Sequence, residues 1–405
     1  MRLVVVADSD SYVKWGAALA GSLPDGWQRE LLVIESKFTV NDTQLRSALR
    51  DSGIEQGTRV RYRELGELLT GIAPDAVLVA APGPVARVLI RLVAGLRPCP
   101  VIVSGLPGIS IPATVKALRF RLQSDLMVVH SHREVREFTA LSREHGWDHR
   151  LALARLPFTT EHPVSGTDLV FAPQAVVPRA REDRVEVARM LRDAALADLA
   201  HRVVVKLRAL AGERSTHPED DAYPELLAAL GPIPDNLVFS DGPMSRALDT
   251  AAGLVTVSST ALIEAVARGI PVIAIDTFGV TAALINPVFE GSGLFGGRDA
   301  VVAREFRDPD VAWLADNYFH DAAESDWAAS LEELVAARRA GRLPARSGLR
   351  MRGGASRAAW DRKRALGAAD PSLSGRAALV VGVPLRALVL AGHRLRRAAS
   401  GARTS

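Results

Sequence analysis

The sequence has little cysteine and few aromatic residues. Cys99 is the one cysteine among 405 residues, which excludes a disulfide framework and any metal site built from several cysteines, and which fits a reducing compartment. Aromatic side chains make up 5% of the chain, so few are present on which nucleic-acid bases could stack. Hydrophobic residues reach 48% and charged residues 24%. This composition is typical of a soluble globular protein with room for two domains, and it excludes a mostly disordered chain.

Long hydrophobic segments are also missing. The stretch before Asp8 is too short for the core of a signal peptide. No run reaches the roughly 20 apolar residues that span a bilayer. The nearest, residues 377–392, is interrupted by Pro384 and Arg386. We therefore expect a cytoplasmic protein, with any membrane contact at the inner face of the cell membrane.

Positive charge is concentrated at the C-terminal end. The chain has 50 Lys and Arg against 46 Asp and Glu, a net charge of +4. Residues 331–405 contain 16 basic and 4 acidic residues, so this segment has a net charge of +12 and the first 330 residues have a net charge of −8. On charge grounds, the body of the protein is not expected to bind nucleic acid.

The first 156 residues alternate between short apolar runs and segments with helical periodicity. Apolar runs without polar alternation are typical of strands buried on both faces, and strands that alternate with helices indicate a parallel sheet. The predicted strands are Leu3–Ala7, Glu30–Ile34, Arg59–Tyr62, Ala76–Ala80, Pro100–Ser104, Leu126–His130 and Leu151–Leu156. The predicted helices include Ser11–Ser22, Thr43–Ser52, Val85–Gly95, Ile111–Leu122 and Glu134–His145.

A second series of the same kind follows residues 157–166, a segment rich in turn-forming residues that we interpret as a linker. Its predicted elements are strand Leu169–Ala172, helix Arg181–Ala200, strand Arg202–Leu207, helix Tyr223–Leu230, strands Leu237–Phe239 and Leu254–Val257, helix Ala261–Arg268 and strand Val272–Ile275. The predicted fold class is therefore α/β, with two Rossmann-like domains at 1–160 and 167–340 that face a cleft, and a basic tail at 341–405. A cleft of this kind is the natural ligand site.

Three hydroxyl residues follow a buried strand of the second series. Ser258, Ser259 and Thr260 open a helix in which Glu264 lies one turn further on. Either Ser258 or Ser259 is suited to cap this helix, and the free amides there can hold a phosphate. The carboxylate of Glu264 could accept hydrogen bonds from ribose hydroxyls. The alternative is ordinary helix capping and a solvated Glu264.

A basic cluster follows an earlier strand of the same series. The strand brings Lys206 to its carboxyl end, where ligands bind in open α/β sheets, and Arg208 follows. After a glycine-containing loop comes His217, which Pro218 biases away from helical geometry. Lys206 and His217 could balance the charge of a phosphate leaving group without a metal ion. The alternative is a solvated basic loop.

Taken together, the two clusters resemble a known family. His217-Pro218, followed some forty residues later by Ser258-Ser259-Thr260, resembles the HP and SS motifs of capsule-type bacterial glycosyltransferases, which include polysialyltransferases and Kdo transferases. The Ser-Ser-x-x-x-x-Glu-Ala-x-x-x-Gly-x-Pro-Val layout is similar to the donor-binding helix of GT-B glycosyltransferases. Residues 1–330 also look like a bacterial family that carries a provisional glycosyltransferase label.

The resemblance implies a GT-B-like fold and roles for matching residues. His217, Pro218 and the Ser258–Thr260 segment would contact the donor nucleotide in the C-terminal domain, and the N-terminal domain would bind the acceptor. An Asp/Glu-Asp/Glu-Gly motif that polysialyltransferases carry in their N-terminal half is not visible here, which leaves the donor and the catalytic base open.

Two carboxylates follow the first predicted strand. Asp8 or Asp10 could deprotonate an acceptor hydroxyl, since strand-to-helix loops at this sheet edge face the cleft. Ser9 and Lys14 would lie on the acceptor side with them. The alternative is that Asp8 ends the strand and that Asp10 or Ser11 caps the helix, with Asp10 the better cap.

Other strand ends carry further candidates. Gly105 and Gly108 would let the backbone approach an acceptor closely, or would simply form a tight turn. The segment 35–37, Glu-Ser-Lys, is a third candidate for the acceptor side. His130 and His132 point to opposite faces of a strand end without a nearby carboxylate, so we expect no metal site there.

The sequence therefore predicts metal-independent transfer of a sugar from a nucleotide-sugar to a cell-surface glycan or lipid-linked acceptor, by inverting displacement and without a cofactor. A nucleotide-sugar epimerase of the same fold and a non-catalytic scaffold are the alternatives. Residues 377–397 pair an apolar stretch with a basic end, which would suit peripheral contact with an anionic membrane or else form a disordered tail.

Overall fold

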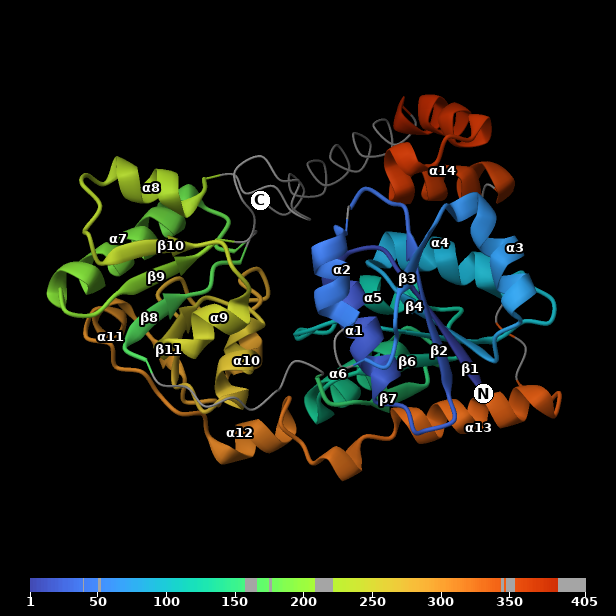
Figure 1. Ribbon diagram of the computed structural model, residues 1–405, viewed down its shortest axis with the longest axis horizontal. Helices are drawn as coiled ribbons and strands as arrows, with labels where there is room; N and C mark the ends of the chain where they lie inside the picture. The colour runs from blue at the N-terminus through green and yellow to red at the C-terminus, as the bar shows by residue number, and fades with distance from the viewer. Residues whose placement is uncertain are drawn as a thin grey trace, which may run out of the picture. The chain divides into compact units, whose positions relative to one another are not determined.

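The computed structural model describes residues 1–38, 40–49, 52–156, 166–174, 177–207, 221–343, 346 and 354–384. Two parallel sheets, each with helices packed against it, account for most of these residues (Figure 1). The expectation of two α/β halves built on parallel sheets is confirmed.

The first sheet has seven strands in the order β3-β2-β1-β4-β5-β6-β7. The strands are β1 Arg2–Ala7, β2 Gln28–Ile34, β3 Gly57–Val60, β4 Ala76–Ala80, β5 Val101–Gly105, β6 Leu126–Val129 and β7 Leu151–Leu153. In the central pairings Val5 lies opposite Leu31 on one side and Leu78 on the other, both in parallel register. The interior strands are apolar at nearly every position because both faces of the sheet are covered.

The helices that connect these strands are α1 Asp10–Gly21, α2 Asp42–Leu49, α3 Tyr62–Ile72, α4 Gly83–Ala94, α5 Val115–Phe120 and α6 His132–Glu144. Several boundaries differ from prediction by a few residues, and the sequence explains two of these differences. Strand β3 ends at Val60 because Arg61 is the N-cap of α3. The helix predicted from Ile111 begins only at Val115, since Pro112 disfavours helical geometry in the residue before it.

The second sheet has six strands in the order β10-β9-β8-β11-β12-β13. They are β8 Asp168–Phe171, β9 Val203–Lys206, β10 Leu237–Ser240, β11 Ala251–Thr256, β12 Val272–Ile275 and β13 Phe295–Gly296. The helices of this part are α7 Arg181–Ala197, α8 Tyr223–Ala229, α9 Met244–Asp249, α10 Ala261–Ala267, α11 Arg298–Val302 and α12 Val311–Asp316. Helix α13, Trp327–Arg339, follows them in the chain and returns to the first sheet, where Arg338 and Arg339 pair with Asp75 just before β4. Neighbouring side chains of β11 alternate between two apolar cores, with Val255 in the core that includes α7 and Leu254 in the core that includes α10.

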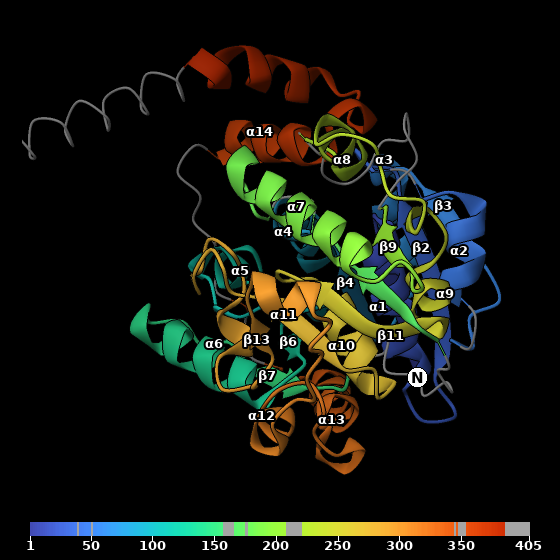
Figure 2. The same cartoon turned by 90° about the vertical axis from the view of Figure 1, so that its left-hand side faces the viewer.

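Part of the predicted tail is folded. Helix α14, Gly354–Leu366, packs against α4, and Ala365 and Leu366 join the apolar core of the first sheet. Arg87 of α4 forms an ion pair of 2.8 Å with Asp361, whose side chain is 5% exposed. Residues 373–384 form a further helix beside α14 (Figure 2). Among the described residues, no helix combines the length and the apolar character needed to cross a bilayer.

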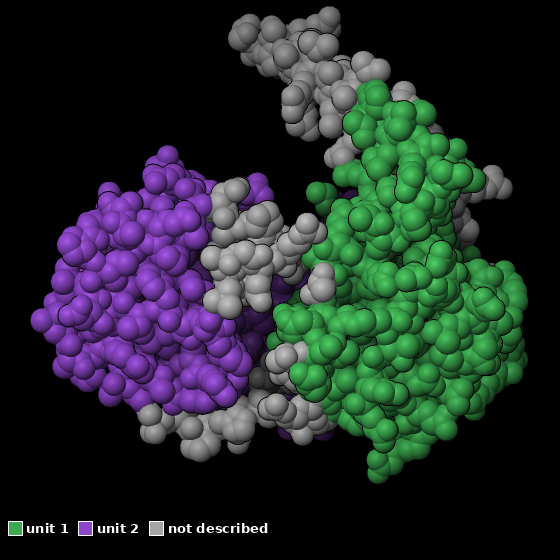
Figure 3. All heavy atoms as spheres, turned by 45° about the horizontal axis from the view of Figure 1, so that its top comes forward, with its two compact units in different colours: residues 1–104, 116–127, 331–405 green, residues 105–115, 128–330 purple. Residues whose placement is uncertain are grey.

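By contacts, the chain divides into two compact units (Figure 3). Unit 1 comprises residues 1–104, 116–127 and 331–405, and unit 2 comprises residues 105–115 and 128–330. These units cross the predicted domain boundaries, because α6, β7 and the loop after β5 make their contacts within unit 2 and α14 makes its contacts within unit 1. The boundaries at 1–160, 167–340 and 341–405 stay a prediction.

Candidate functional site

Asp8 lies at the carboxyl end of β1, in the middle of the first sheet. Its side chain is fully buried, and within the described part of the chain neither carboxylate oxygen has a hydrogen-bond partner. Burial raises the pKa of Asp8 to about 7, although the nearby hydroxyls of Ser9 and Ser36 act in the opposite direction. A buried carboxylate without partners is costly for a fold to keep, which makes Asp8 a candidate for function.

The start of α1 differs from the prediction. Ser9, not Asp10 or Ser11, is the N-cap, and its side chain makes no capping hydrogen bond. Asp10 is the first helical residue and pairs with Lys14 at 3.1 Å, with both side chains partly exposed. Ser9 is buried and its hydroxyl has no partner, so Asp8 and Ser9 together form an unsatisfied polar pair at the end of β1.

A buried cation lies near the same strand end. Arg121 is 1% exposed and donates hydrogen bonds to Ser104 Oγ at 3.1 Å and to the carbonyl of Ala81 at 3.2 Å. Burial raises the pKa of Tyr12. The positive charge of Arg121 lowers this pKa, and the carboxylate of Asp8 raises it further. Neither Tyr12 nor Arg121 could be predicted as part of this site. The residue pattern within each segment does not reveal that α1 and the segment after α5 lie close together in the fold.

The Ser258–Thr260 segment follows β11 in unit 2. Thr260 occupies the N-cap of α10 and makes no side-chain capping bond, so the prediction that Ser258 or Ser259 caps this helix is wrong. Ser259 is used locally: its amide donates to Thr256 Oγ1 at 3.1 Å and its hydroxyl accepts from the amide of Ala261 at 3.3 Å. Ser258 is 3% exposed, and its hydroxyl has no hydrogen-bond partner.

Other polar groups lie at the same edge of the second sheet. Gln174 follows β8, the neighbour of β11, and its Oε1 is buried without a partner. Lys206 ends β9 and is 7% exposed; its ammonium donates to the backbone carbonyls of Leu207 and Ser240. Glu264 is half-buried in the first turn of α10. Gln174 was missed, although a polar residue just after a fully buried strand is a signal that the sequence contains.

The loop after β5 meets the Ser258–Thr260 segment within unit 2. A Cβ atom on Gly108 would lie 2.9 Å from Thr260 Oγ1, so the close approach requires glycine. Gly108, predicted on the acceptor side, packs against Thr260 of the segment predicted to bind the donor, and its role towards an acceptor stays a prediction. Gly105 is the last residue of β5 and is buried. Arg208, His217 and Pro218 lie outside the described residues.

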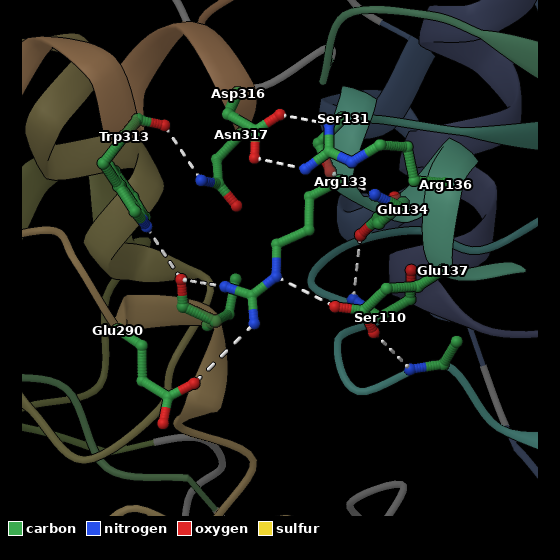
Figure 4. A network of polar contacts seen from close by, with 12 residues as sticks. Ser110, Ser131, Arg133, Glu134, Arg136, Glu137, Glu290, Trp313, Asp316 and Asn317 are labelled. Carbon is green, nitrogen blue, oxygen red and sulfur yellow. Dashed lines mark hydrogen bonds and ion pairs between the residues drawn. The ribbon is translucent and has the colours of Figure 1, made fainter.

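A network of hydrogen bonds connects the loop after β5 to helix α6 and to the segment after α12 (Figure 4). Glu134 of α6 is fully buried and accepts hydrogen bonds from the amides of Ser110 and His130 and from the hydroxyl of Tyr318, at 2.7 to 3.0 Å. Burial and the adjacent carboxylate hold the pKa of Tyr318 well above its usual range, so the phenol remains a donor. Arg133 of α6 extends towards the segment after β12, where it donates to the carbonyl of Val288 at 3.3 Å, and it also bonds Glu137 at 2.9 Å (Figure 4).

The two histidines next to this network are structural. His130 is fully buried between the carbonyls of Leu106 and Ala154, and burial lowers its pKa. His132 pairs with Glu324 at 2.8 Å. Within the described ranges, no group of three or more His, Cys, Asp or Glu side chains is arranged to hold a metal ion.

The chain matches a known protein family over most of its length. Residues 3–334 match the model of the family described as "Putative glycosyltransferase (DUF6716)". The chain belongs to this family. Its members are classed as enzymes that transfer sugars, in agreement with the prediction from sequence. No curated protein matches the chain.

Solved structures support the fold assigned to this glycosyltransferase family member. A UDP-N-acetylglucosamine 2-epimerase from Listeria monocytogenes aligns with a TM-score of 0.56 at 11% identity, over 86% of this chain and 98% of that chain. The S. aureus MnaA structure with UDP aligns with a TM-score of 0.54 at 11% identity, over 86% and 100%. The UDP-GlcNAc 2-epimerase of Methanocaldococcus jannaschii gives 0.54 at 10% identity, over 82% and 99%. The two parallel-sheet domains are therefore of the GT-B-like, Rossmann type.

Proposed function

We propose that the protein transfers a sugar from a nucleotide-sugar to an acceptor hydroxyl, with Asp8 as the general base. The observation that carries the proposal is the state of Asp8: it is fully buried, neither oxygen has a partner, and its pKa is raised to about 7. A general base is most effective when its pKa lies near the working pH, because it is then both deprotonated and basic enough to take a proton.

The proposed reaction is a direct displacement. The Asp8 carboxylate accepts the hydroxyl proton of the acceptor while the acceptor oxygen forms a bond to the anomeric carbon. The bond from that carbon to the phosphate oxygen breaks, and the nucleotide leaves with the electron pair. Because the acceptor attacks opposite the leaving group, the configuration at the anomeric carbon inverts. In this proposal Asp10 is secondary, since its side chain is 34% exposed and one of its oxygens, Oδ2, pairs with Lys14.

The donor phosphates are assigned to the carboxyl edge of the second sheet. Support comes from Ser258 and Gln174, whose buried polar atoms have no hydrogen-bond partner among the residues that the structure describes. Lys206 ends β9, two strands from β11, and strand spacing puts the two strand ends about 10 Å apart. The charge of Lys206 would therefore act on a departing phosphate through the field at this edge and not by direct contact. The hydroxyls of Ser259 and Thr260 complete the phosphate contacts.

The remaining roles are proposed from the sequence. His217, Pro218 and Arg208 would contact the donor nucleotide, and Glu264 would accept its ribose hydroxyls. Ser9, Lys14 and Gly105 are assigned to the acceptor, which we propose is a cell-surface glycan or a lipid-linked sugar reached from the cytoplasm. The proposed reaction needs neither a metal ion nor a cofactor.

The test begins with binding. Calorimetry against CMP-, UDP-, GDP- and dTDP-sugars, in buffer with a chelator, should identify one class of nucleotide that binds. The sugar-nucleotide that binds is then incubated with candidate acceptors, and release of the nucleotide is followed with pH. The rate should rise with an apparent pKa near 7, and Asp8→Asn should lower kcat by roughly 10²-fold or more while leaving the donor Kd unchanged.

Three outcomes would contradict this proposal. Conversion of the donor to an epimer in the absence of any acceptor would favour an epimerase of the same fold. Unchanged turnover in Asp8→Asn would remove Asp8 from the reaction, and binding of no nucleotide-sugar would favour a scaffold.

A further inference from the structure

The helix formed by residues 373–384 has an exposed apolar face. Leu373, Val380 and Val381 are 81%, 75% and 61% exposed. At 3.6 residues per turn these positions lie on one face, together with the exposed residues Ala377 and Pro384. Soluble proteins rarely leave adjacent large apolar side chains in water, so a continuous apolar stripe indicates a surface that docks.

The opposite face of this helix already has a partner. Gly382 lies against Trp360 of α14 so closely that a Cβ atom on the glycine would be 2.3 Å from the indole ring. Helix α14 is in turn fixed to α4 by the ion pair of Arg87 with Asp361. The helix, which lies beside α14 (Figures 1 and 2), is thus held on unit 1 by the face that contains Gly382. At 3.6 residues per turn, Leu373 and Val380 lie on the opposite face.

The charge around this face is of one sign. Residues 354–384 contain two acidic side chains, Asp361 and Asp370, and both are buried and paired with arginines. Arg364 and Arg376 are exposed. Residues 371–405 contain six arginines and no acidic residue. An apolar helix face with positive charges beside it is complementary to the interface of a bilayer that contains acidic phospholipids. There the apolar acyl chains lie beneath a layer of anionic headgroups.

We propose that the apolar face of helix 373–384 inserts into the interface of an anionic lipid bilayer and anchors unit 1 there. The side chains of Leu373, Val380 and Val381 enter the level of the acyl chains, and Arg364 and Arg376 contact the lipid phosphates. This surface is separate from Asp8 and from the Ser258–Thr260 segment, so the proposal does not depend on the assignment of the enzymatic reaction.

The experiment is co-sedimentation of the full chain with vesicles of phosphatidylcholine, with or without phosphatidylglycerol, at low and high salt. The protein should bind the anionic vesicles, and high salt should weaken binding because it screens the arginines. The double variant Val380→Asp/Val381→Asp should bind at least about tenfold more weakly, since it removes apolar contact and adds charge that the anionic lipid repels.

A matched control separates this effect from a general loss of solubility or fold. Val311→Asp places the same change on α12, at a valine that is 79% exposed, and should bind vesicles like the unchanged protein. Thermal unfolding of each variant should match the parent protein. Equal binding by the double variant and the parent, or equal binding to neutral and anionic vesicles, would overturn the proposal.

A second copy of the chain is the competing occupant of the apolar face. Light scattering without lipid should show a monomer. A dimer that the double variant dissociates would refute the membrane role. Donor binding by calorimetry should be unchanged in the double variant, so a failure of the membrane proposal and a failure of the proposed reaction give different results.

Discussion

Replacing Asp8 by asparagine should make the protein more stable at neutral and alkaline pH. The pKa of this carboxyl rises from 3.8 to about 7 on folding, with burial as the main cause. A tenfold change in an acid dissociation constant corresponds to about 1.4 kcal/mol, so keeping Asp8 ionised above pH 7 costs the folded state about 4 kcal/mol. Asparagine is nearly isosteric and carries no charge, so the variant does not bear this cost.

The pH dependence follows from the direction in which the pKa moves. Below pH 3.8 the carboxyl is protonated in both states and costs nothing. Between 3.8 and 7 the unfolded chain loses the proton before the folded protein does, so the penalty grows with pH and is complete above pH 7. The gain in unfolding free energy for Asp8→Asn should therefore be about 2 kcal/mol at about pH 5.5 and about 4 kcal/mol at about pH 8.

Urea unfolding followed by circular dichroism across this range measures the gain directly. Asp10→Asn is the control, because this carboxylate is partly exposed and its pair with Lys14 contributes less than about 1 kcal/mol. A gain for Asp8→Asn that stays below about 1 kcal/mol at pH 8, or that does not change with pH, would refute the reasoning from burial. The expected combination of higher stability and lost turnover is typical of a residue kept for function.

Three other changes test the remaining assignments. Ser258→Ala should weaken donor binding about tenfold by calorimetry without lowering the melting temperature, because among the described residues its hydroxyl has no partner to lose. Ser292→Ala is the control, because it removes a hydroxyl that donates to a buried carbonyl at 2.6 Å. This control should lower the melting temperature and leave donor binding unchanged. Glu134→Gln should cost about 1–3 kcal/mol of unfolding free energy, and in a double-mutant cycle with Tyr318→Phe the two losses should not add; additive losses would contradict the hydrogen bond between them. Asp361→Ala should cost about 1–3 kcal/mol, since it leaves the guanidinium of Arg87, whose side chain is 18% exposed, without its anion, and should increase hydrogen exchange in α14. Unchanged exchange there would show that the ion pair does not fix the helix.

Most strands of the two sheets could be predicted from the sequence because burial on both faces leaves an uninterrupted apolar run. Strand β13, Phe295–Gly296, was not predicted, because two residues form no such run. Strands β4 and β12 have the predicted bounds, Ala76–Ala80 and Val272–Ile275. Helix α14 could not be predicted in this way. Its arginine-rich sequence resembles a solvated tail, and it folds because α4 offers an apolar surface and Arg87, which lie more than 250 residues earlier in the chain.

The candidate site was predicted only in part. Asp8 was a candidate because it follows a buried strand, but the choice between Asp8 and Asp10 required the burial and the partners that only the folded chain reveals. The cap of α10 was misassigned because serine is a better cap than threonine by residue type. In the structure Thr260 occupies the N-cap position with helical backbone angles and no capping side-chain bond, and the hydroxyl of Ser259 accepts from the amide of Ala261.

The packing of α14 on α4 has a consequence for the order in which the chain folds during synthesis. Unit 1 begins at the first residue, yet its apolar core includes Ala365 and Leu366, and α13 and α14 belong to it. Most of unit 2 consists of residues 128–330, which leave the ribosome before α14 is made. Since domains generally fold as they emerge, we expect unit 2 to fold first. Strands β1 to β5 would then form a sheet whose apolar core is incomplete until α14 has been translated.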